Sequence, residues 1–338
     1  MRSYRCCGSR CITAWAGYED INDALRLARD PAMQAVVGRR ALEKQAASKN
    51  TVNWFETDVL ISEDNLWGLR QLNAGWVGQA VVHTLHQRII LDMHSSESPL
   101  HGEHEGAVYN GHFGCVCYHP LFLFNQFGDC EGAMLRLGNV HSAERWRELL
   151  ETTVERYQNR ESRLVFRADA AFAKPEVYEY PEPRDIGYAI RLPANEMLQE
   201  HIKHLLKRSV GRPPQKPTVW YHDFLYQVGS WDHPRRLVAK VEWHLGELSP
   251  RVGFIVTSLC AKPKAMVHVY NRHALSSQTC PQRDWKRNRY SSTLQRHHFK
   301  QLLIYTRIYS WFLIHEYILG FLLLRISNNR CRSLSAVH

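Results

Sequence analysis

Two short apolar runs in this chain each end in a single aspartate. Residues 88–93 read Arg-Ile-Ile-Leu-Asp-Met and then give way to hydroxyls, an acid and a proline in 94–99, which predicts a short buried strand ending near Asp92. Residues 163–172 repeat the pattern and place Asp169 just after the apolar run. Open α/β sheets place their chemistry at the carboxyl ends of strands. The two aspartates are therefore candidates for one shared site.

The apolar spacing before residue 88 is that of helices. Residues 17–45 and 55–74 carry apolar positions at intervals near 3.6, and Asp30-Pro31 breaks the first of these stretches. We expect a small bundle of helices here, with packing as its simplest role.

From residue 88 onward the pattern predicts three meandering strands followed by alternating helices and strands. The first three strands are expected at 88–93, 114–127 and 133–137, with a hairpin turn at Gly128-Asp129. A helix follows, with Ser142 as N-cap and an apolar face of Trp146, Leu149, Leu150, Val154 and Tyr157. A strand at 163–169, a short helix from Pro175 and a strand at 187–192 complete the order. This order predicts an α/β fold with an RNase H-like mixed sheet flanked by helices. The two acids then lie on the first and fourth strands.

Beyond Pro193 the chain becomes basic and then strand-like. The basic positions that we propose for DNA binding are Lys203, Lys207, Arg208 and Arg212, and strands are expected at 219–228, 236–243 and 252–259. With Trp220, Tyr221, Trp231 and Trp243 nearby, the segment could follow a phosphate backbone. A solvated loop next to core aromatics is an equally good interpretation.

These patterns divide the chain into five parts. We expect a helical region at 1–85, an RNase H-like core at 86–193, a β-rich insertion at 194–250, a return to the core at 251–272, and a basic and apolar tail at 273–338.

Charge is distributed unevenly along the 338 residues, whose formal net charge is +10. The last 66 residues hold ten basic and two acidic residues, which leaves 33 basic and 31 acidic residues in the first 272. The body is therefore nearly neutral, and a basic surface over the whole molecule is not supported.

Nine cysteines without regular spacing, and no secretion signal, indicate a reducing compartment, and we expect the cytoplasm, in association with the nucleoid. Cys115 and Cys117 are best interpreted as core cysteines, because zinc sites usually place two or more residues between paired ligands. His101, His104 and His112 offer only a weak zinc alternative.

Paired carboxylates suit phosphodiester chemistry, in which two Mg²⁺ ions hold the attacking and leaving oxygens. Mg²⁺ prefers oxygen ligands and keeps several waters, so Asp92 and Asp169 could supply two of its ligands. A strand-end aspartate is also often a turn or cap residue. Both interpretations stay open on the residues alone.

An ordered series of motifs resembles the DDE-type transposases of bacterial insertion sequences. The motifs lie at 91–99, 101–106, 109–115, 118–122, 137–143, 167–172, 187–193, 238–243 and 270–272, and the resemblance covers roughly residues 17 to 272. It implies an RNase H-like core that uses three acids and Mg²⁺ or Mn²⁺ for DNA cleavage and strand transfer. It also implies insertion-sequence ends and target DNA as partners, in an assembly that a homodimer would satisfy.

The chain departs from that family pattern at two acids. The family usually shows Leu-Asp-x-Asp at the first acid, and here His94 stands at the second Asp position. Positions 92 and 94 share one side of a strand, so either could face the metal. The family's third acid is a Glu that follows a Tyr-Asn-x-Arg element, but here no Glu lies between Glu247 and Glu316.

The tail suggests that the C-terminus is truncated or frameshifted, because the motifs end where the charge changes. Residues 302–324 are strongly apolar, but Arg307, His315 and Glu316 interrupt them, so a membrane span is disfavoured. Three hypotheses follow: a transposase with reduced or lost activity, a non-catalytic DNA-binding remnant, and a protein attached to a membrane by its tail.

Overall fold

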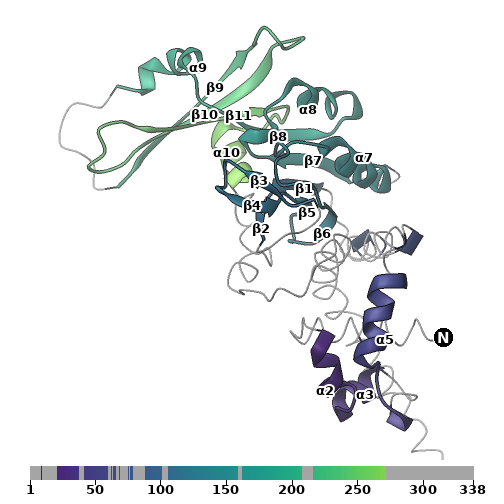
Figure 1. Cartoon of the computed structure of the whole chain (residues 1–338). Coiled ribbons are helices and arrows are strands. Elements are labelled where there is room, and N and C mark those ends of the chain that lie inside the picture. The colour runs from purple at the N-terminus through teal and green to yellow at the C-terminus, as the bar shows by residue number, and fades with distance from the viewer. Residues whose placement is uncertain are drawn as a thin grey trace, which may run out of the picture. The chain divides into compact units, whose positions relative to one another are not determined.

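The computed structural model describes residues 21–37, 42–59, 88–100, 106–158, 162–207 and 216–271, together with the isolated positions 9, 62, 64, 65, 68, 75, 77 and 78 (Figure 1). The chain forms two compact units. One comprises Met1–Trp76, His101–Glu105 and Asp284–His338, and the other comprises Val77–Leu100 and Gly106–Arg283.

Short helices make up the described part of the first unit. They are η1 (Ile21–Asp23), α2 (Ala24–Leu27), α3 (Pro31–Val37), α5 (Lys49–Trp54) and the π-helical turn η2 (Phe55–Val59). The predicted break at Asp30-Pro31 is confirmed, since α3 begins at Pro31 and the Asp30 carboxylate accepts a 2.8 Å hydrogen bond from the Met33 amide. Met33 and Ala46 form a small buried cluster.

The second unit is built around an eight-stranded sheet. Its strands are β1 (Arg88–Ser95), β5 (Leu121–Asn125), β6 (Cys130–Met134), β7 (Arg163–Ala168), β8 (Gly187–Leu192), β9 (Thr218–Tyr226), β10 (Arg235–Trp243) and β11 (Arg251–Thr257). A small second sheet holds β2 (Ser98–Pro99), β3 (Val108–Asn110) and β4 (Cys115–Tyr118) in the order β2-β4-β3.

The strand order of the large sheet is β6-β5-β1-β7-β8-β11-β10-β9. The strands β1, β7 and β8 run parallel, whereas β5 and β6 on one side and β11, β10 and β9 on the other pair antiparallel. The first five strands thus form three antiparallel strands joined to a parallel pair. The predicted RNase H-like mixed sheet is confirmed.

Both faces of this sheet carry helices. On one face, α7 (Trp146–Tyr157) buries the five apolar residues expected from its spacing in the same core as Ile89, Leu91 and Met93 of β1. On the other face, α10 (Pro263–Asn271) packs Met266 and Val267 against Ala189, Val238 and Ile255. The remaining short helices are η3 (Ala170–Phe172), α8 (Pro175–Glu179), η4 (Glu182–Arg184), α9 (Glu196–His201) and η5 (Lys203–Leu205).

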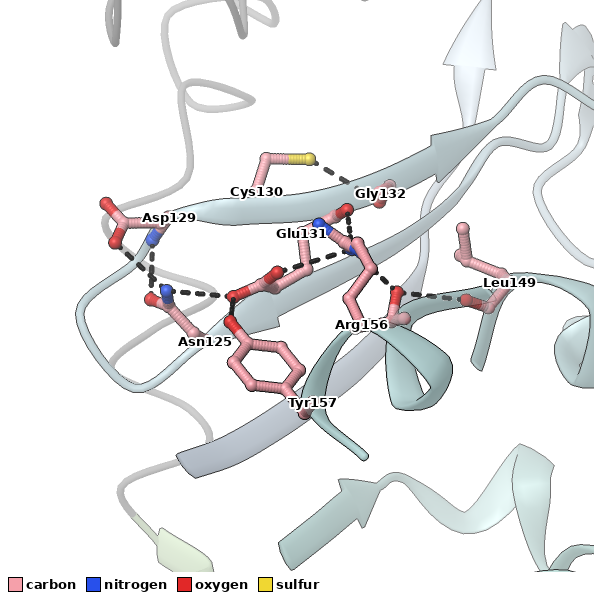
Figure 2. A network of polar contacts seen from close by, with 9 residues as sticks. Asn125, Asp129, Cys130, Glu131, Gly132, Leu149, Arg156 and Tyr157 are labelled. Carbon is pink, nitrogen blue, oxygen red and sulfur yellow. Dashed lines mark hydrogen bonds and ion pairs between the residues drawn. The ribbon is translucent and has the colours of Figure 1, made fainter. Parts of the chain in front are cut away.

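A buried polar network joins the β5–β6 hairpin to α7, as Figure 2 shows. The carboxylate of Glu131 accepts hydrogen bonds from the Tyr157 hydroxyl at 2.6 Å and from the Asn125 amide at 3.2 Å. The Arg156 guanidinium adds a 2.7 Å hydrogen bond to the Glu131 carbonyl. Burial of the carboxyl raises the pKa of Glu131, while Arg156 and Tyr157 oppose the shift.

Two local predictions were wrong. Residues 114–127 form two strands in different sheets, because the chain breaks at His119-Pro120 and proline has no amide hydrogen to donate. Ser142 is not the N-cap of α7, since the helix begins at Trp146 after Arg145, which has a left-handed backbone with φ of 55°.

The segment expected as a β-rich insertion contributes β9 and β10, and these strands extend the main sheet through β11. The chain therefore leaves the core after β8 and returns to it with β11, which pairs with β8.

Candidate functional site

The carboxyl ends of β1 and β7 lie side by side, as the sequence predicts for the two aspartates. The strands pair in parallel, with Asp92 opposite Arg167 and Met93 opposite Ala168. Asp169 follows directly after β7. The two aspartates are thus on neighbouring strands but two residue levels apart along the sheet.

Asp92 lies in a buried ion pair with Arg167. The Arg167 Nε donates to one carboxylate oxygen at 2.5 Å, and its Nη2 donates to the other at 2.5 Å. The side chain of Asp92 is 0% exposed and that of Arg167 is 2% exposed. Both oxygens of Asp92 are therefore engaged by a guanidinium inside the protein.

The C-terminal end of α10 contacts the same part of β7. Arg167 Nη1 donates to the carbonyl of Val269, and the hydroxyl of Tyr270 donates to the Ala168 carbonyl at 3.3 Å. Burial raises the pKa of Tyr270 to about 12, with the Asp169 charge adding to the shift and the Arg191 charge opposing it. The Tyr270 hydroxyl is therefore protonated at neutral pH and lies near both charges.

Two residues further along the three strands, polar side chains mark the end of the sheet. Side chains alternate between faces, so His94 of β1 and Arg191 of β8 are the next residues on the face of Asp92. Asp169 follows directly after β7, the strand between β1 and β8. His94 and Asp169 are half-buried and Arg191 is exposed. We call His94, Asp169 and Arg191 the strand-end row.

Asp169 also shapes the local backbone. Its Oδ1 accepts a 2.8 Å hydrogen bond from the Ala171 amide and so caps the short helix η3. The interpretation of Asp169 as a cap residue is thus confirmed. Capping through one oxygen does not exclude a second role for the carboxylate.

A family model described as "Transposase DDE domain group 1" matches residues 8–301. The chain belongs to this family. Its fold is similar to that of a piggyBac transposase, solved by cryo-EM as a synaptic complex with hairpin DNA, with a TM-score of 0.50 and 12% sequence identity. The match covers 92% of this chain and 65% of that one, so the chain spans less than two thirds of the piggyBac protein. No curated protein matches the chain significantly.

The family match is wider than the motifs, which span roughly 17 to 272. It continues to residue 301, past the point where the motifs end. The truncated or frameshifted C-terminus stays a prediction, because residues 272–338 lie outside the described part of the chain.

Family membership implies a divalent metal, and the strand-end row of this transposase-family chain does not supply a carboxylate set for one. Mg²⁺ prefers oxygen ligands, whereas His94 offers nitrogen and Arg191 repels cations. The oxygens of Asp92 are held by Arg167. Among the described residues, no group of three or more histidines, cysteines or acids is arranged to hold an ion. The choice between Mg²⁺ and Mn²⁺ stays a prediction.

Two arginines of this site were not predicted from the sequence. The signal for Arg167 is present, because a lone arginine inside the buried run Leu-Val-Phe-Arg-Ala requires a partner. Arg191 interrupts the apolar strand β8 in the same way, at its exposed end.

The predicted DNA-binding positions are only partly described. Lys203 is 66% exposed and pairs with Glu200 at 2.8 Å, and Lys207 is exposed. Arg208 and Arg212 lie outside the described residues. Two residues before Lys203, His201 stacks on Phe224 of β9 with ring centroids 4.7 Å apart, and Trp220 is exposed on the same strand. DNA binding by this segment stays a prediction.

The interpretation of the central cysteine pair as core residues is confirmed for Cys117. Cys117 is fully buried, and burial together with the neighbouring Cys115 raises the pKa of its thiol to about 11. His101 and His104 lie outside the described residues, and His112 is exposed.

Across the described residues, the helices are too short or too polar to cross a bilayer. The apolar stretch 302–324 lies outside the described residues.

Proposed function

We propose that this chain is a transposase-type DNA-binding protein that does not cleave DNA by itself. One observation carries the proposal: the residue of β1 that follows Asp92 on the same face is His94 and not a carboxylate, while Asp92 itself is buried and bound to Arg167. DNA cleavage and strand transfer at insertion-sequence ends is the activity that family membership suggests. In this chain we expect that activity to be reduced or lost.

The physical reason lies in how charge builds up during phosphoryl transfer. Carboxylates hold metal ions that neutralise the developing charge on the phosphate oxygens. A row with one carboxylate, one imidazole and one guanidinium gives Asp169 no second carboxylate within the described site. Misplacement of a reacting group by about 1 Å can cost roughly 10²-fold in rate.

The same row suits phosphate contact without a metal. Arg191 can donate two hydrogen bonds to a phosphate, and His94 can donate one. Lys203 and Lys207 add exposed positive charge elsewhere on the second unit. We therefore propose that DNA is held through charge and hydrogen bonds, and that EDTA does not weaken this binding.

We further propose that the protein works as a homodimer in the cytoplasm, associated with the nucleoid.

The test is strand cleavage of DNA that carries the element's own ends, with Mg²⁺ or Mn²⁺. We expect no end-specific nicking by the natural chain and retention of binding in EDTA. The variant His94→Asp should raise divalent-ion affinity, because it places a second carboxylate beside Asp169. Specific nicking by the natural chain that disappears in Asp169→Ala would show an intact active site and overturn the proposal.

A chain that has lost cleavage can still recognise the element's ends, and the cleavage assay does not test that recognition. Competition with an active relative tests for this recognition. A chain that recognises the ends should block their cutting by the relative, whereas a chain that binds DNA without sequence preference should not.

A further inference from the structure

We propose that Asp92 and Arg167 form a positioning pair, which holds the C-terminal end of α10 against the strand-end row. In this assignment Asp92 is not a metal ligand. The inference rests on the proposed function only in treating the strand-end row as the site that faces DNA.

The first argument is how Arg167 uses its donors. Two of its nitrogens, Nε and Nη2, bind the two oxygens of Asp92, which orients the planar guanidinium. The remaining terminal nitrogen, Nη1, then points at the carbonyl of Val269 in α10. Asp92 therefore orients Arg167, and Arg167 holds the helix.

The second argument is burial. Asp92 and Arg167 are almost completely shielded from solvent. An incoming metal ion would have to displace Arg167 and leave a buried guanidinium without its counter-charge, which is strongly unfavourable. We therefore expect Asp92 to stay bound to Arg167 when divalent ions are present.

The third argument is that α10 is held at two kinds of contact. Met266 and Val267 pack on Ala189, Val238 and Ile255, and such apolar packing is not directional. The polar contacts of Val269 and Tyr270 are directional, and both reach β7 within two residues of Asp169. Packing therefore holds the helix on the sheet, and the polar contacts fix the position of its end.

Hydrogen exchange with mass spectrometry on the full chain tests this assignment. In Arg167→Lys the ion pair can persist, but an ammonium cannot reproduce the three-nitrogen fork. We expect amides of residues 266–271 to exchange about tenfold faster than in the natural chain, the scale of one lost hydrogen bond, while β1, β5 and α7 stay unchanged. The control is Arg163→Lys, at the exposed start of the same strand.

Rescue separates positioning from simple charge balance. If Arg167 only neutralises Asp92, then Arg167→Lys should restore both the denaturation midpoint and the α10 exchange rates relative to Arg167→Gln. Positioning predicts recovery of the midpoint without recovery of the exchange rates. Recovery of both would overturn the proposal.

Tyr270→Phe provides a second variant in case Arg167 substitutions do not fold. It removes the hydroxyl contact with Ala168 and should also speed exchange at the end of α10. Unchanged exchange in Tyr270→Phe would contradict the proposal. Mn²⁺ binding is measured by electron paramagnetic resonance, and binding by the natural chain that is lost in Asp92→Asn would also contradict it. These measurements do not depend on DNA cleavage, so a failed nicking assay leaves them interpretable.

Discussion

Two aspartates at neighbouring strand ends have different environments in this protein. Asp92 is enclosed with Arg167, and Asp169 is half-buried at the edge of the sheet where it caps η3. The difference comes from two residues along the β-ladder, since Met93 and Ala168, one pair beyond Asp92 and Arg167, are still buried and the outer level follows them. Position 94, which holds histidine, occupies that outer level on β1.

Removing the Asp92 carboxylate should destabilise the fold strongly. Asp92→Ala leaves Arg167 buried and unpaired, and breaking a buried pair in this way typically costs about 3–5 kcal/mol. Urea unfolding measures the loss. The double variant Asp92→Leu with Arg167→Met should lose less than Asp92→Ala, because it leaves no buried charge. Equal losses would indicate that the pair contributes mainly through packing.

Glu131 predicts a dependence of stability on pH. Burial raises its pKa in the folded protein above the ordinary 4.5, so the folded state favours the protonated carboxyl. The stability that Glu131 contributes relative to Glu131→Gln should be fully present below pH 4.5 and should fall as pH rises through the folded pKa. Urea unfolding of both chains over a pH series gives this difference.

Glu148 provides a control of opposite sign. It is exposed on α7, and the hydrogen bond from Arg145 lowers its pKa. Its contribution relative to Glu148→Gln should be small, present above its ordinary pKa and lost as pH falls. The same trend at both glutamates would contradict the assignment of the Glu131 effect to burial.

The elements of the core were largely predictable because their signals are local. The apolar face of α7, the hairpin at Gly128 and the strand β8 follow from spacing and turn residues. The pairing of Asp92 with Arg167 was not predictable, because its partners lie 75 residues apart and pairing depends on strand register. The same holds for the contact between Arg167 and Val269, at a separation of 102 residues.

A glycine next to the small sheet should tolerate no side chain. A Cβ at Gly138 would lie 2.1 Å from the Cys117 carbonyl and 2.4 Å from the Val108 carbonyl, both of which are backbone atoms with little freedom to move. Gly138→Ala should therefore cost about 1–3 kcal/mol or more in thermal or urea unfolding. Gly253→Ala is the matched control, since a Cβ there meets nothing within 4 Å. Similar effects of the two substitutions would show that lost backbone freedom outweighs the close contacts.

Over the whole second unit, one sheet joins the core to the segment inserted between β8 and β11. The strands β9 and β10 continue the same hydrogen-bonded ladder, so the basic segment at 203–212 belongs to the same unit as the strand-end row. The nearly neutral body that the sequence predicts is consistent with DNA contact through a few local positions.

Salt dependence of DNA binding should report those positions. Each phosphate contact contributes a slope of roughly −0.9 to log K against log salt on duplex DNA. The double variant Lys203→Gln with Lys207→Gln should make the slope about 2 units shallower if both lysines contact phosphates. Lys44→Gln, an exposed lysine of the first unit, serves as the comparison. An unchanged slope in the double variant would place the DNA elsewhere.

The long sequence separations around Arg167 have a consequence for the order of folding during synthesis. The β5–β6 hairpin can form as soon as it leaves the ribosome, because its contacts are local. The ion pair of Asp92 can form only after Arg167 has been synthesised. The hydrogen bond from Arg167 Nη1 can form only after Val269 has been synthesised, 102 residues later. Until then a buried guanidinium has one hydrogen bond fewer than in the finished fold. The nascent chain therefore completes this end of its sheet last, when α10 arrives.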